Sequence, residues 1–151
     1  MLDKRFLLLL GLVVLVAIIF VFWRVQKPAP QGATQQLTIG KTTYTVELAT
    51  TLIEQARGLS GRESLPAGHG MLFVFAAPSM QAFWMHGMKL PLDFIWINNG
   101  TVIGVTENVP ARSTDIYRPP APAELVLEVN AGTVAHDGIK VGDKVTSGYD
   151  Q

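Results

Sequence analysis

The sequence contains no cysteine, and this absence removes several kinds of chemistry at once. Disulfide bonds, a thiolate nucleophile and a lipidated cysteine are all excluded. An oxidising compartment is permitted by the absence of cysteine but is not indicated by it, so the location of the protein has to be argued from other features.

The part of the chain after residue 33 also lacks a basic cluster. The formal net charge of the 151 residues is zero, but residues 1–33 carry four basic side chains and one acidic side chain. The remaining residues therefore carry eight basic and eleven acidic side chains, a net charge of −3. A nucleic-acid-binding domain normally shows a basic face, so we expect no nucleic-acid partner.

Signatures of common catalytic and cofactor sites are missing as well. The serines Ser60, Ser64 and Ser79 do not lie in a nucleophile elbow, and the short run Gly68-His69-Gly70 is not a phosphate-binding loop. No internal repeat is visible, and we predict no cofactor.

One long hydrophobic run is present, from Phe6 to Trp23. At about 1.5 Å per residue, a helix of this length spans roughly 27 Å, which is enough to cross the hydrocarbon core of a bilayer. The alternative is a cleaved signal peptide, but its apolar region is shorter, and no small-residue cleavage site follows the pair Phe22-Trp23. We predict a retained transmembrane anchor over residues 6–23, with the lipid bilayer as its partner.

The orientation of this anchor is argued from the charges beside it. Lys4 and Arg5 precede the run, whereas Arg24 and Lys27 follow it, and the free amino terminus adds a positive charge on the first side. We therefore predict a cytoplasmic segment at residues 1–5 and a single-pass protein of a bacterial inner membrane. Its C-terminal domain would lie in the periplasm or another extracytoplasmic space.

The rest of the chain divides by composition. Residues 24–36 contain Pro, Gly and polar residues without periodicity, which is typical of a flexible linker. Residues 37–147 have the size of one soluble domain, and residues 148–151 form a C-terminal tail.

Alternating and continuous apolar runs in the domain predict short strands. The Asn99-Gly100 pair between two such runs predicts a tight hairpin, and Thr51-x-x-Glu54 predicts a capping box at the start of the only helix, residues 51–57. Leu52, Ile53, Ala56 and Leu59 are expected to form one face of that helix, which packs on the sheet. The strands are expected at residues 37–39, 44–48, 71–75, 82–85, 92–97, 101–105, 124–130 and 142–145. Together these elements predict a mainly β fold, either a compact β-sandwich or a partly open barrel.

The stretch from Phe83 to Phe94 places aromatic, thioether, imidazole and carboxylate groups around one Pro-bounded bend. We interpret it as the candidate ligand-binding surface, formed by Trp84, Met85, His86, Asp93, Trp96 and Asn130. Asp93 has two interpretations: it accepts backbone N–H bonds at the bend, or it lines a cleft together with Glu128. In the second case Asp93 and Glu128 are candidate catalytic carboxylates that act on a glycan or peptide beside aromatic side chains.

A third hypothesis concerns the triplet His-Gly-Met, which occurs at residues 69–71 and again at residues 86–88. Thioether and imidazole groups suit Cu(I), so the candidate metal ligands are His69, Met71, Met85, His86 and Met88. The alternative is that the methionines fill the core and the histidines lie on surface loops.

Six ordered blocks of the domain are similar to a known family. They cover residues 46–49, 57–62, 70–75, 83–85, 90–93 and 127–132. In this order the chain resembles the domain-of-unknown-function family 192 over residues 37 to about 147. The resemblance implies a small, mostly β domain, commonly secreted or anchored in bacteria, with no established activity.

The chain departs from the family pattern at two places. His86-Gly87-Met88 stands where the family usually has Lys-Asn-Thr, and Gly58-Leu59-Ser60-Gly61-Arg62 stands where the family usually has Gly-Leu-Met-x-Arg. The sequence therefore favours a membrane-anchored, extracytoplasmic, non-catalytic module that binds an unknown envelope ligand or protein. The alternatives are an envelope enzyme that uses Asp93 and Glu128, and a Cu(I)-binding domain.

Overall fold

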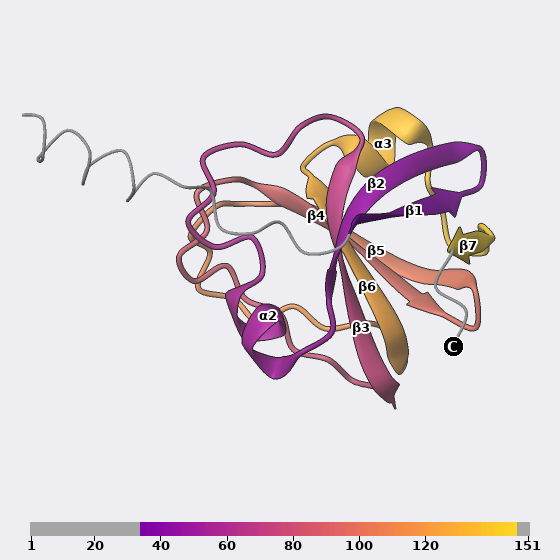
Figure 1. Cartoon of the computed structure of the whole chain (residues 1–151), viewed down its shortest axis with the longest axis horizontal. Coiled ribbons are helices and arrows are strands. Elements are labelled where there is room, and N and C mark those ends of the chain that lie inside the picture. Colours follow the sequence, from indigo (N-terminus) through magenta and orange to yellow (C-terminus); the bar gives the residue numbers. More distant parts are fainter. Residues whose placement is uncertain (1–33, 148–151) are drawn as a thin grey trace, which may run out of the picture. The chain divides into compact units, whose positions relative to one another are not determined.

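The computed structural model describes residues 34–147 (Figure 1). Its strands and helices are β1 (Thr34–Ile39), β2 (Thr42–Ala49), α2 (Leu52–Arg57), β3 (His69–Ser79), β4 (Leu92–Asn98), β5 (Thr101–Val109), β6 (Ala123–Asn130), α3 (Thr133–Asp137) and β7 (Val145–Ser147). The predicted anchor at residues 6–23 and the tail at 148–151 lie outside the described residues. Neither helix in the described range is long and apolar enough to cross a bilayer.

All seven strands belong to one sheet, in the order β5-β4-β6-β3-β2-β1-β7. Neighbouring strands are antiparallel except β2 and β3, which are parallel because α2 and the following loop cross over between them. The sequence predicts either a two-sheet sandwich or a partly open barrel, and the sandwich is therefore wrong.

The sheet curls so that its two edge strands meet at one end. Thr101, at the start of β5, forms an isolated bridge with Lys144, immediately before β7. The backbone N–H of Val102 donates to the carbonyl of Asp143 at 2.9 Å, and that of Val145 donates to Gly100 at 2.9 Å. The fold is thus a mainly β half-barrel, which agrees with the partly open barrel expected from the sequence.

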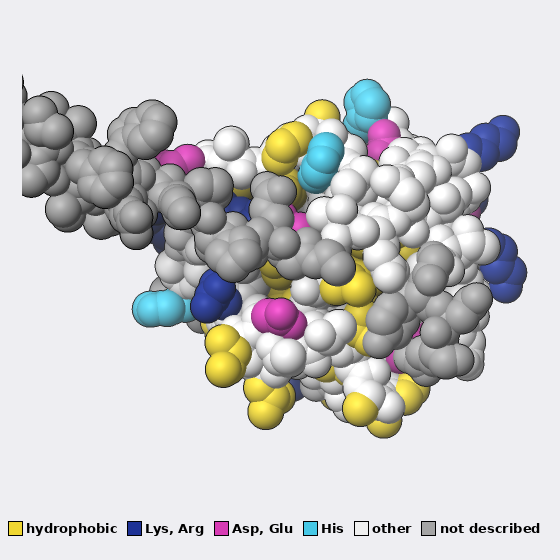
Figure 2. Space-filling view, viewed as in Figure 1, with side chains coloured by type: hydrophobic (Ala, Val, Ile, Leu, Met, Phe, Trp, Pro, Cys, Tyr) yellow, Lys and Arg dark blue, Asp and Glu magenta, His cyan; other side chains and the backbone are white. Residues whose placement is uncertain are grey.

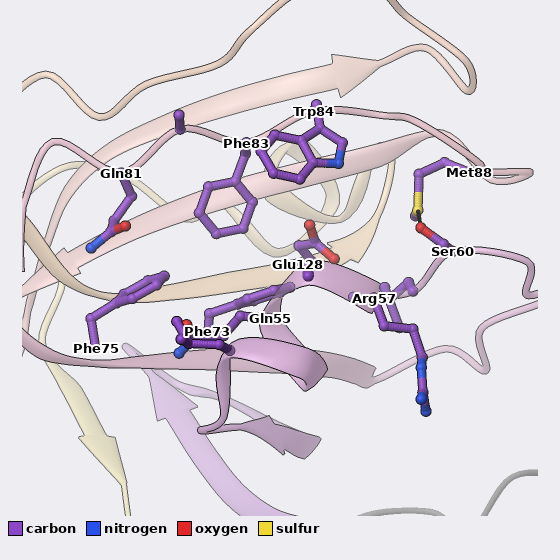
Figure 3. A pocket seen from close by; sticks show the side chains of 15 residues that line it. Gln55, Arg57, Ser60, Phe73, Phe75, Gln81, Phe83, Trp84, Met88 and Glu128 are labelled. Carbon is purple, nitrogen blue, oxygen red and sulfur yellow. Dashed lines mark hydrogen bonds between the residues drawn. The ribbon is translucent and has the colours of Figure 1, made fainter.

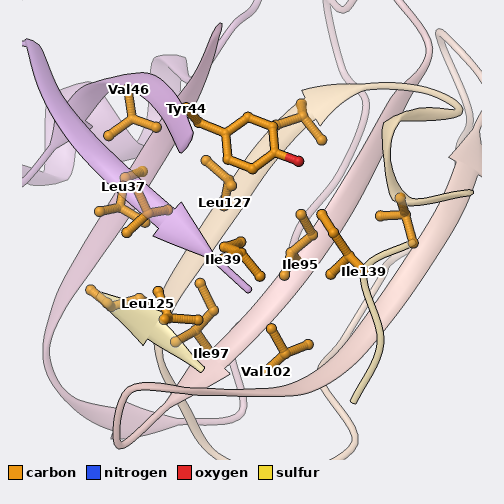
Figure 4. Packing of buried hydrophobic residues seen from close by; sticks show 14 of the residues in the cluster. Leu37, Ile39, Tyr44, Val46, Ile95, Ile97, Val102, Leu125, Leu127 and Ile139 are labelled. Atoms are coloured by element: carbon orange, nitrogen blue, oxygen red, sulfur yellow. The ribbon is translucent and has the colours of Figure 1, made fainter. Parts of the chain in front are cut away.

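The concave side of the sheet encloses the first hydrophobic core (Figure 4). Its members come from all the strands, because alternate side chains of a strand point to the same face. They include Leu37, Tyr44, Leu72, Ile95, Leu127 and Val129, each at most 1% exposed.

A second hydrophobic cluster lies on the opposite face of the sheet. Phe73, Phe94, Trp96 and Val126 supply it from the strands, and loop residues cover it. The covering side chains are Leu59, Leu65, Phe83, Met85 and Met88. Both faces of β3, β4 and β6 are therefore buried, and this second core forms the floor of the site described below.

Several local predictions are confirmed. Asn99 and Gly100 both adopt positive φ, 49° and 58°, and connect β4 to β5 as a tight hairpin. Thr51 and Glu54 form the predicted capping box, in which the Glu54 backbone N–H donates to Thr51 Oγ1 and the Glu54 carboxylate accepts from the Thr51 backbone N–H.

Other local predictions are wrong. Residues 34–36 are not linker but part of β1, since they pair with residues 45–47 of β2. Residues 82–85 are not a strand, because only Phe83 forms a bridge, to Tyr117. The last strand covers 145–147 instead of 142–145, and the five-residue helix α3 was not expected.

The predicted buried face of α2 is also wrong in part. Leu59 is fully buried just beyond the helix, but Leu52 and Ile53 are 85% and 71% exposed. The helix lies at the edge of the second core instead of across it. Its apolar side chains consequently border a cleft.

Candidate functional site

A cleft of about 250 Å³ lies above the second core (Figure 3). One wall is α2 with the turn that follows it to Ser60, and the other is the segment from Gln81 to Trp84. Phe73 and Phe75 of β3 and Glu128 of β6 form its floor. The cleft therefore joins segments that are far apart in the sequence.

Glu128 is the carboxylic acid of this cleft, and it is 4% exposed. Its cross-strand neighbours are Met71 on β3 and Phe94 on β4, both buried. The Oε2 atom has no hydrogen-bond partner among the described residues. Desolvation by burial raises the pKa of Glu128 to about 8, because the charged carboxylate loses its water without gaining a donor.

Gly58 keeps the approach to this carboxyl open. It ends α2 with φ 50°, a conformation that favours glycine. A Cβ atom at this position would lie 3.3 Å from Phe73 Cζ and 3.8 Å from Glu128 Oε2. Any larger residue would therefore intrude on the space beside the carboxyl oxygen.

Aromatic side chains form much of the cleft. Phe83 packs edge-to-face on Phe73, with 4.9 Å between ring centroids, and also contacts Phe75 and Trp96. Trp84 follows Phe83 and is 49% exposed at the rim. Phe83 is thus fixed by the core, whereas Trp84 presents an indole to solvent and to the cleft.

The rim continues as an exposed hydrophobic border on α2. Leu52 lines the cleft, Ile53 lies next to it in the sequence, and both are largely exposed. Hydrophobic side chains are visible on the surface near the position of α2 in the same view (Figure 2). Exposed apolar side chains beside a concave surface are typical of a binding site.

The other polar groups around the cleft have partners or point elsewhere. Gln55 Nε2 donates to the carbonyls of Ala49 and Val74, at 3.2 and 2.8 Å. Ser60 Oγ donates to the carbonyl of His86 at 3.1 Å. The guanidinium of Arg57 points away from Glu128 (Figure 3). Glu128 is therefore the polar group of the cleft that a ligand could satisfy.

Asp93 lies on the other face of the sheet. It pairs with Val129, whereas Glu128 pairs with Phe94, so the two carboxylates point in opposite directions. Asp93 is fully buried and accepts the backbone N–H groups of Asn108 at 2.7 Å and of Val134 at 2.9 Å. The interpretation of Asp93 as a backbone acceptor is correct, and its pairing with Glu128 in one cleft is wrong.

The structure brings the remaining members of the predicted ligand surface together only in part. Trp96 is fully buried and its Nε1 donates to Thr106 Oγ1 at 2.9 Å, and Met85 is also fully buried. Asn130 Nδ2 donates to the carbonyl of Leu65 at 2.8 Å. The exposed His86 lines a second hollow together with Trp84, Met85 and Arg112. Trp84 is the member of that set that lines the cleft.

The proposed metal ligands are similarly divided. Met71, Met85 and Met88 are at most 6% exposed and belong to the second core, whereas His69 and His86 are exposed. In the described part of the chain, no group of three or more His, Cys, Asp or Glu side chains is placed to hold a metal ion. The core-filling interpretation of the methionines agrees with these positions.

The sequence does not predict the helical wall of the cleft or the burial of Glu128. The strand Glu124 to Asn130 alternates in sequence, so Glu128 falls on the face that also carries the partly exposed Glu124. That face is covered near Glu128 by the loop segments of the second core, which no local pattern reveals. A signal was nevertheless present: Glu128 shares its face with Val126 and lies between Leu127 and Val129.

Comparison with known proteins agrees with the family resemblance. The profile of the family DUF192, described as "Uncharacterized ACR", matches residues 35–147. The chain belongs to this family. No curated protein matches it.

Two solved structures are similar to this chain. A candidate transcription regulator of Sinorhizobium meliloti 1021 is 32% identical, with a TM-score of 0.75 over 80% of this chain and 98% of that chain. A protein of unknown function from Novosphingobium aromaticivorans DSM 12444 is 33% identical, with a TM-score of 0.76 over 80% of this chain and 89% of that chain. These similarities support the half-barrel fold of this DUF192 domain.

Proposed function

We propose that this protein is a non-catalytic ligand-binding module of the bacterial cell envelope, anchored in the inner membrane by residues 6–23. The observation that carries the binding role is the buried, unpartnered carboxyl of Glu128 at the floor of an open aromatic cleft. A binding partner would enter between α2 and the Gln81–Trp84 segment.

The burial of Glu128 is unfavourable in free energy. A polar group removed from water without a hydrogen bond costs roughly 1–3 kcal/mol in proteins, and an ionised group costs more. The free domain bears this cost because no neighbouring side chain satisfies Oε2. A ligand that supplies a donor would remove it, so the same feature that weakens the fold favours binding.

The size of the cleft limits the occupant. Pockets for drug-sized ligands usually enclose about 300–1,000 Å³, and this cleft encloses about 250 Å³. It suits a small molecule or one side chain of a larger partner. The exposed indole of Trp84 and the side chain of Leu52 offer additional apolar contact at the rim.

A blocked cleft tests the binding role. Ala56 lines the cleft on α2, so Ala56→Phe should fill it. The control Val141→Phe adds the same ring at an exposed apolar position that does not line the cleft. Both variants and the parent, as full chains in lipid nanodiscs, would be screened for thermal shifts with envelope glycans, short peptides and small organic ions. A bound ligand raises stability with the logarithm of its excess over Kd. Shifts that persist unchanged in Ala56→Phe would contradict this location of the site.

The membrane role needs a separate test. The supporting observations are the apolar run at residues 6–23, the positive charges before it, and the flexible composition after it. In a bacterial host, the domain should remain with the membrane after carbonate washing and should be digested by protease in spheroplasts. Protection in spheroplasts, with digestion in inverted vesicles, would reverse the proposed orientation.

The alternative hypotheses receive less support from the geometry. A mechanism with two carboxylates needs Asp93 and Glu128 in one cleft, and they lie on opposite faces of the sheet. A regulator that binds DNA would need a basic surface, and residues 34–151 carry more acidic than basic side chains. The charge of these residues therefore does not support a DNA-binding role for this chain.

A further inference from the structure

We infer that the cleft recognises an organic cation, specifically a primary alkylammonium group that enters between the aromatic rings and donates a hydrogen bond to Glu128. This inference rests on the proposed binding function and adds the chemical class of the ligand. Such a group occurs in a free aliphatic amine and in the side chain of a peptide lysine, and the experiment below separates these two sources.

The charges around the cleft favour a cation. Among the residues that line it, Glu128 is the acidic one and Arg57 is the basic one. Arg57 is exposed and its guanidinium is directed away from the carboxyl (Figure 3). An anion would meet the carboxyl of Glu128 with no cation turned toward it, whereas a cation would receive the opposite charge that a buried carboxylate needs.

The aromatic side chains favour a cation for an independent reason. Phe73, Phe75, Phe83 and Trp84 all line the cleft. The face of an aromatic ring is negative, so it attracts a cation that approaches within about 6 Å of the ring centre. For a neutral ligand these rings would supply only apolar contact.

The unpartnered oxygen indicates which cation fits best. Oε2 of Glu128 lacks a donor, and a primary ammonium has N–H groups to offer, whereas a quaternary ammonium has none. The arm that carries the ammonium would lie along Leu52 and Phe75, in the apolar part of the cleft. A four-carbon arm is comparable to a lysine side chain.

Binding should release a proton. Burial raises the pKa of Glu128 to about 8, so the free carboxyl is mostly protonated at neutral pH. The ammonium binds the ionised form: R–NH₃⁺ and Glu128–COOH give the ion pair R–NH₃⁺···⁻OOC–Glu128 and one H⁺, which passes to the buffer. The proton leaves the carboxyl oxygen, and no other bond is made or broken.

The neighbouring elements do not supply a competing titration in the cleft. The cross-strand neighbours of Glu128 on β3 and β4 are Met71 and Phe94, which do not titrate. On the helical wall, Arg57 remains charged at any pH of interest. In the opposite wall, Gln81 to Trp84 carries no charge. The nearby Asp93 is turned to the other face of the sheet.

The test uses the full chain in nanodiscs of uncharged lipid, with titration calorimetry against n-butylammonium and Nα-acetyl-lysine amide. We expect one or both ligands to bind about tenfold more tightly at pH 9 than at pH 7, because the ionised fraction of Glu128 rises about tenfold over this range. The alkylammonium, with a pKa of about 10.4, stays charged at both pH values. Tighter binding of the lysine derivative identifies a peptide side chain as the source, because only its flanking amides can add contacts at the rim. Tighter binding of n-butylammonium identifies a free amine.

Two variants and three comparison ligands test the role of Glu128 and of the ammonium charge. Glu128→Gln should lose the pH dependence and weaken ammonium binding at pH 9 at least tenfold, whereas Glu107→Gln on the exposed part of β5 should change neither. With ¹⁵N-labelled tryptophan, the indole N–H signal of Trp84 should shift on binding, and that of buried Trp96 should stay in place. The comparison ligands are n-butanol, butyrate and tetramethylammonium.

The outcomes separate the two proposals. If n-butanol binds at the cleft as tightly as the ammonium at pH 9, or if Glu128→Gln keeps full affinity, the cation inference is wrong and the binding function stands. A ligand concentration on the order of 10 mM would reveal even a weak site with a millimolar Kd. If none of these ligands at that concentration shifts the Trp84 indole signal, the cation inference is wrong. The screen with Ala56→Phe then decides the binding function separately.

Discussion

The domain contains two buried carboxylates on neighbouring strands, and their surroundings differ completely. Asp93 on β4 is fully buried, and each of its oxygens accepts a backbone N–H. Glu128 on β6 is almost as buried, but its Oε2 has no donor. Burial by itself therefore does not indicate the role of an acidic side chain.

The difference lies in what each carboxylate connects. Asp93 joins β4 to a bulge in β5, opposite Asn108, and to the first turn of α3 through Val134. Loss of Asp93 would leave these two N–H groups without a partner in the interior. Glu128 connects nothing within the described fold, and it faces a cleft that a ligand can enter. The satisfied carboxylate thus holds three elements together, whereas the unsatisfied one is left beside a cleft.

The largest expected effect is at the satisfied carboxylate. Asp93→Ala should destabilise the domain by about 3–5 kcal/mol, because two buried backbone donors lose charged acceptors. Urea unfolding at pH 7 would measure this loss, with Glu107→Ala as the exposed control. A loss below about 1 kcal/mol would mean that water or a rearranged loop replaces the carboxylate, and the contrast with Glu128 would weaken.

The next effect is opposite in sign. Glu128→Gln should stabilise the domain relative to the parent as pH rises, because the folded pKa of about 8 lies above the ordinary value of 4.5. Below the ordinary pKa both folded and unfolded carboxyls are protonated. Between pH 5 and pH 8 the unfolded state loses its proton first, so the parent loses up to roughly 4 kcal/mol of stability that the Gln variant keeps.

Parallel urea titrations of the two proteins at several pH values would measure this difference. The stability gap should widen from pH 5 to pH 8 and then remain constant. A gap that does not depend on pH would show that Glu128 is ionised in the folded state at pH 5, and the argument for its lack of a partner would fail.

A smaller effect is expected at the wall of the cleft. Thr51→Ala removes the side-chain acceptor of the Glu54 backbone N–H and should cost α2 about 1 kcal/mol. Hydrogen exchange should accelerate in α2 while the amide of Val134 beside Asp93 stays protected. Equal acceleration of hydrogen exchange in α2 and at Val134 would show that the cleft wall and the interior unfold together. The surroundings of the two carboxylates would then not be independent.

Much of the fold follows from local patterns. The hairpin at Asn99-Gly100 and the capping box at Thr51 were predictable because each depends on a few adjacent residues. The strand at residues 82–85 was wrong because apolar residues also occur in loops that cover a sheet, and Phe83 and Met85 are buried there without a ladder. Local sequence does not distinguish a buried loop from a short strand.

The candidate site was predictable only in part. Trp84 and Glu128 were both recognised as candidates, but each was grouped with residues that lie elsewhere, such as Asn130, or with Asp93 on the opposite face. Gly58 and the exposed side of α2 were not recognised as parts of a site. The cleft joins β3, β6, α2 and one loop, and their approach depends on the strand order of the sheet.

The sequence by itself determined the residue types, the β-rich composition, the turn at Asn99-Gly100, the helix cap at Thr51 and the similarity to DUF192. Each of these depends on neighbouring residues or on ordered blocks along the chain. The tertiary structure decided which carboxylate is satisfied and which faces a cleft. The physical reason is that a strand exposes two faces, and what covers each face is set by segments that are distant in the sequence.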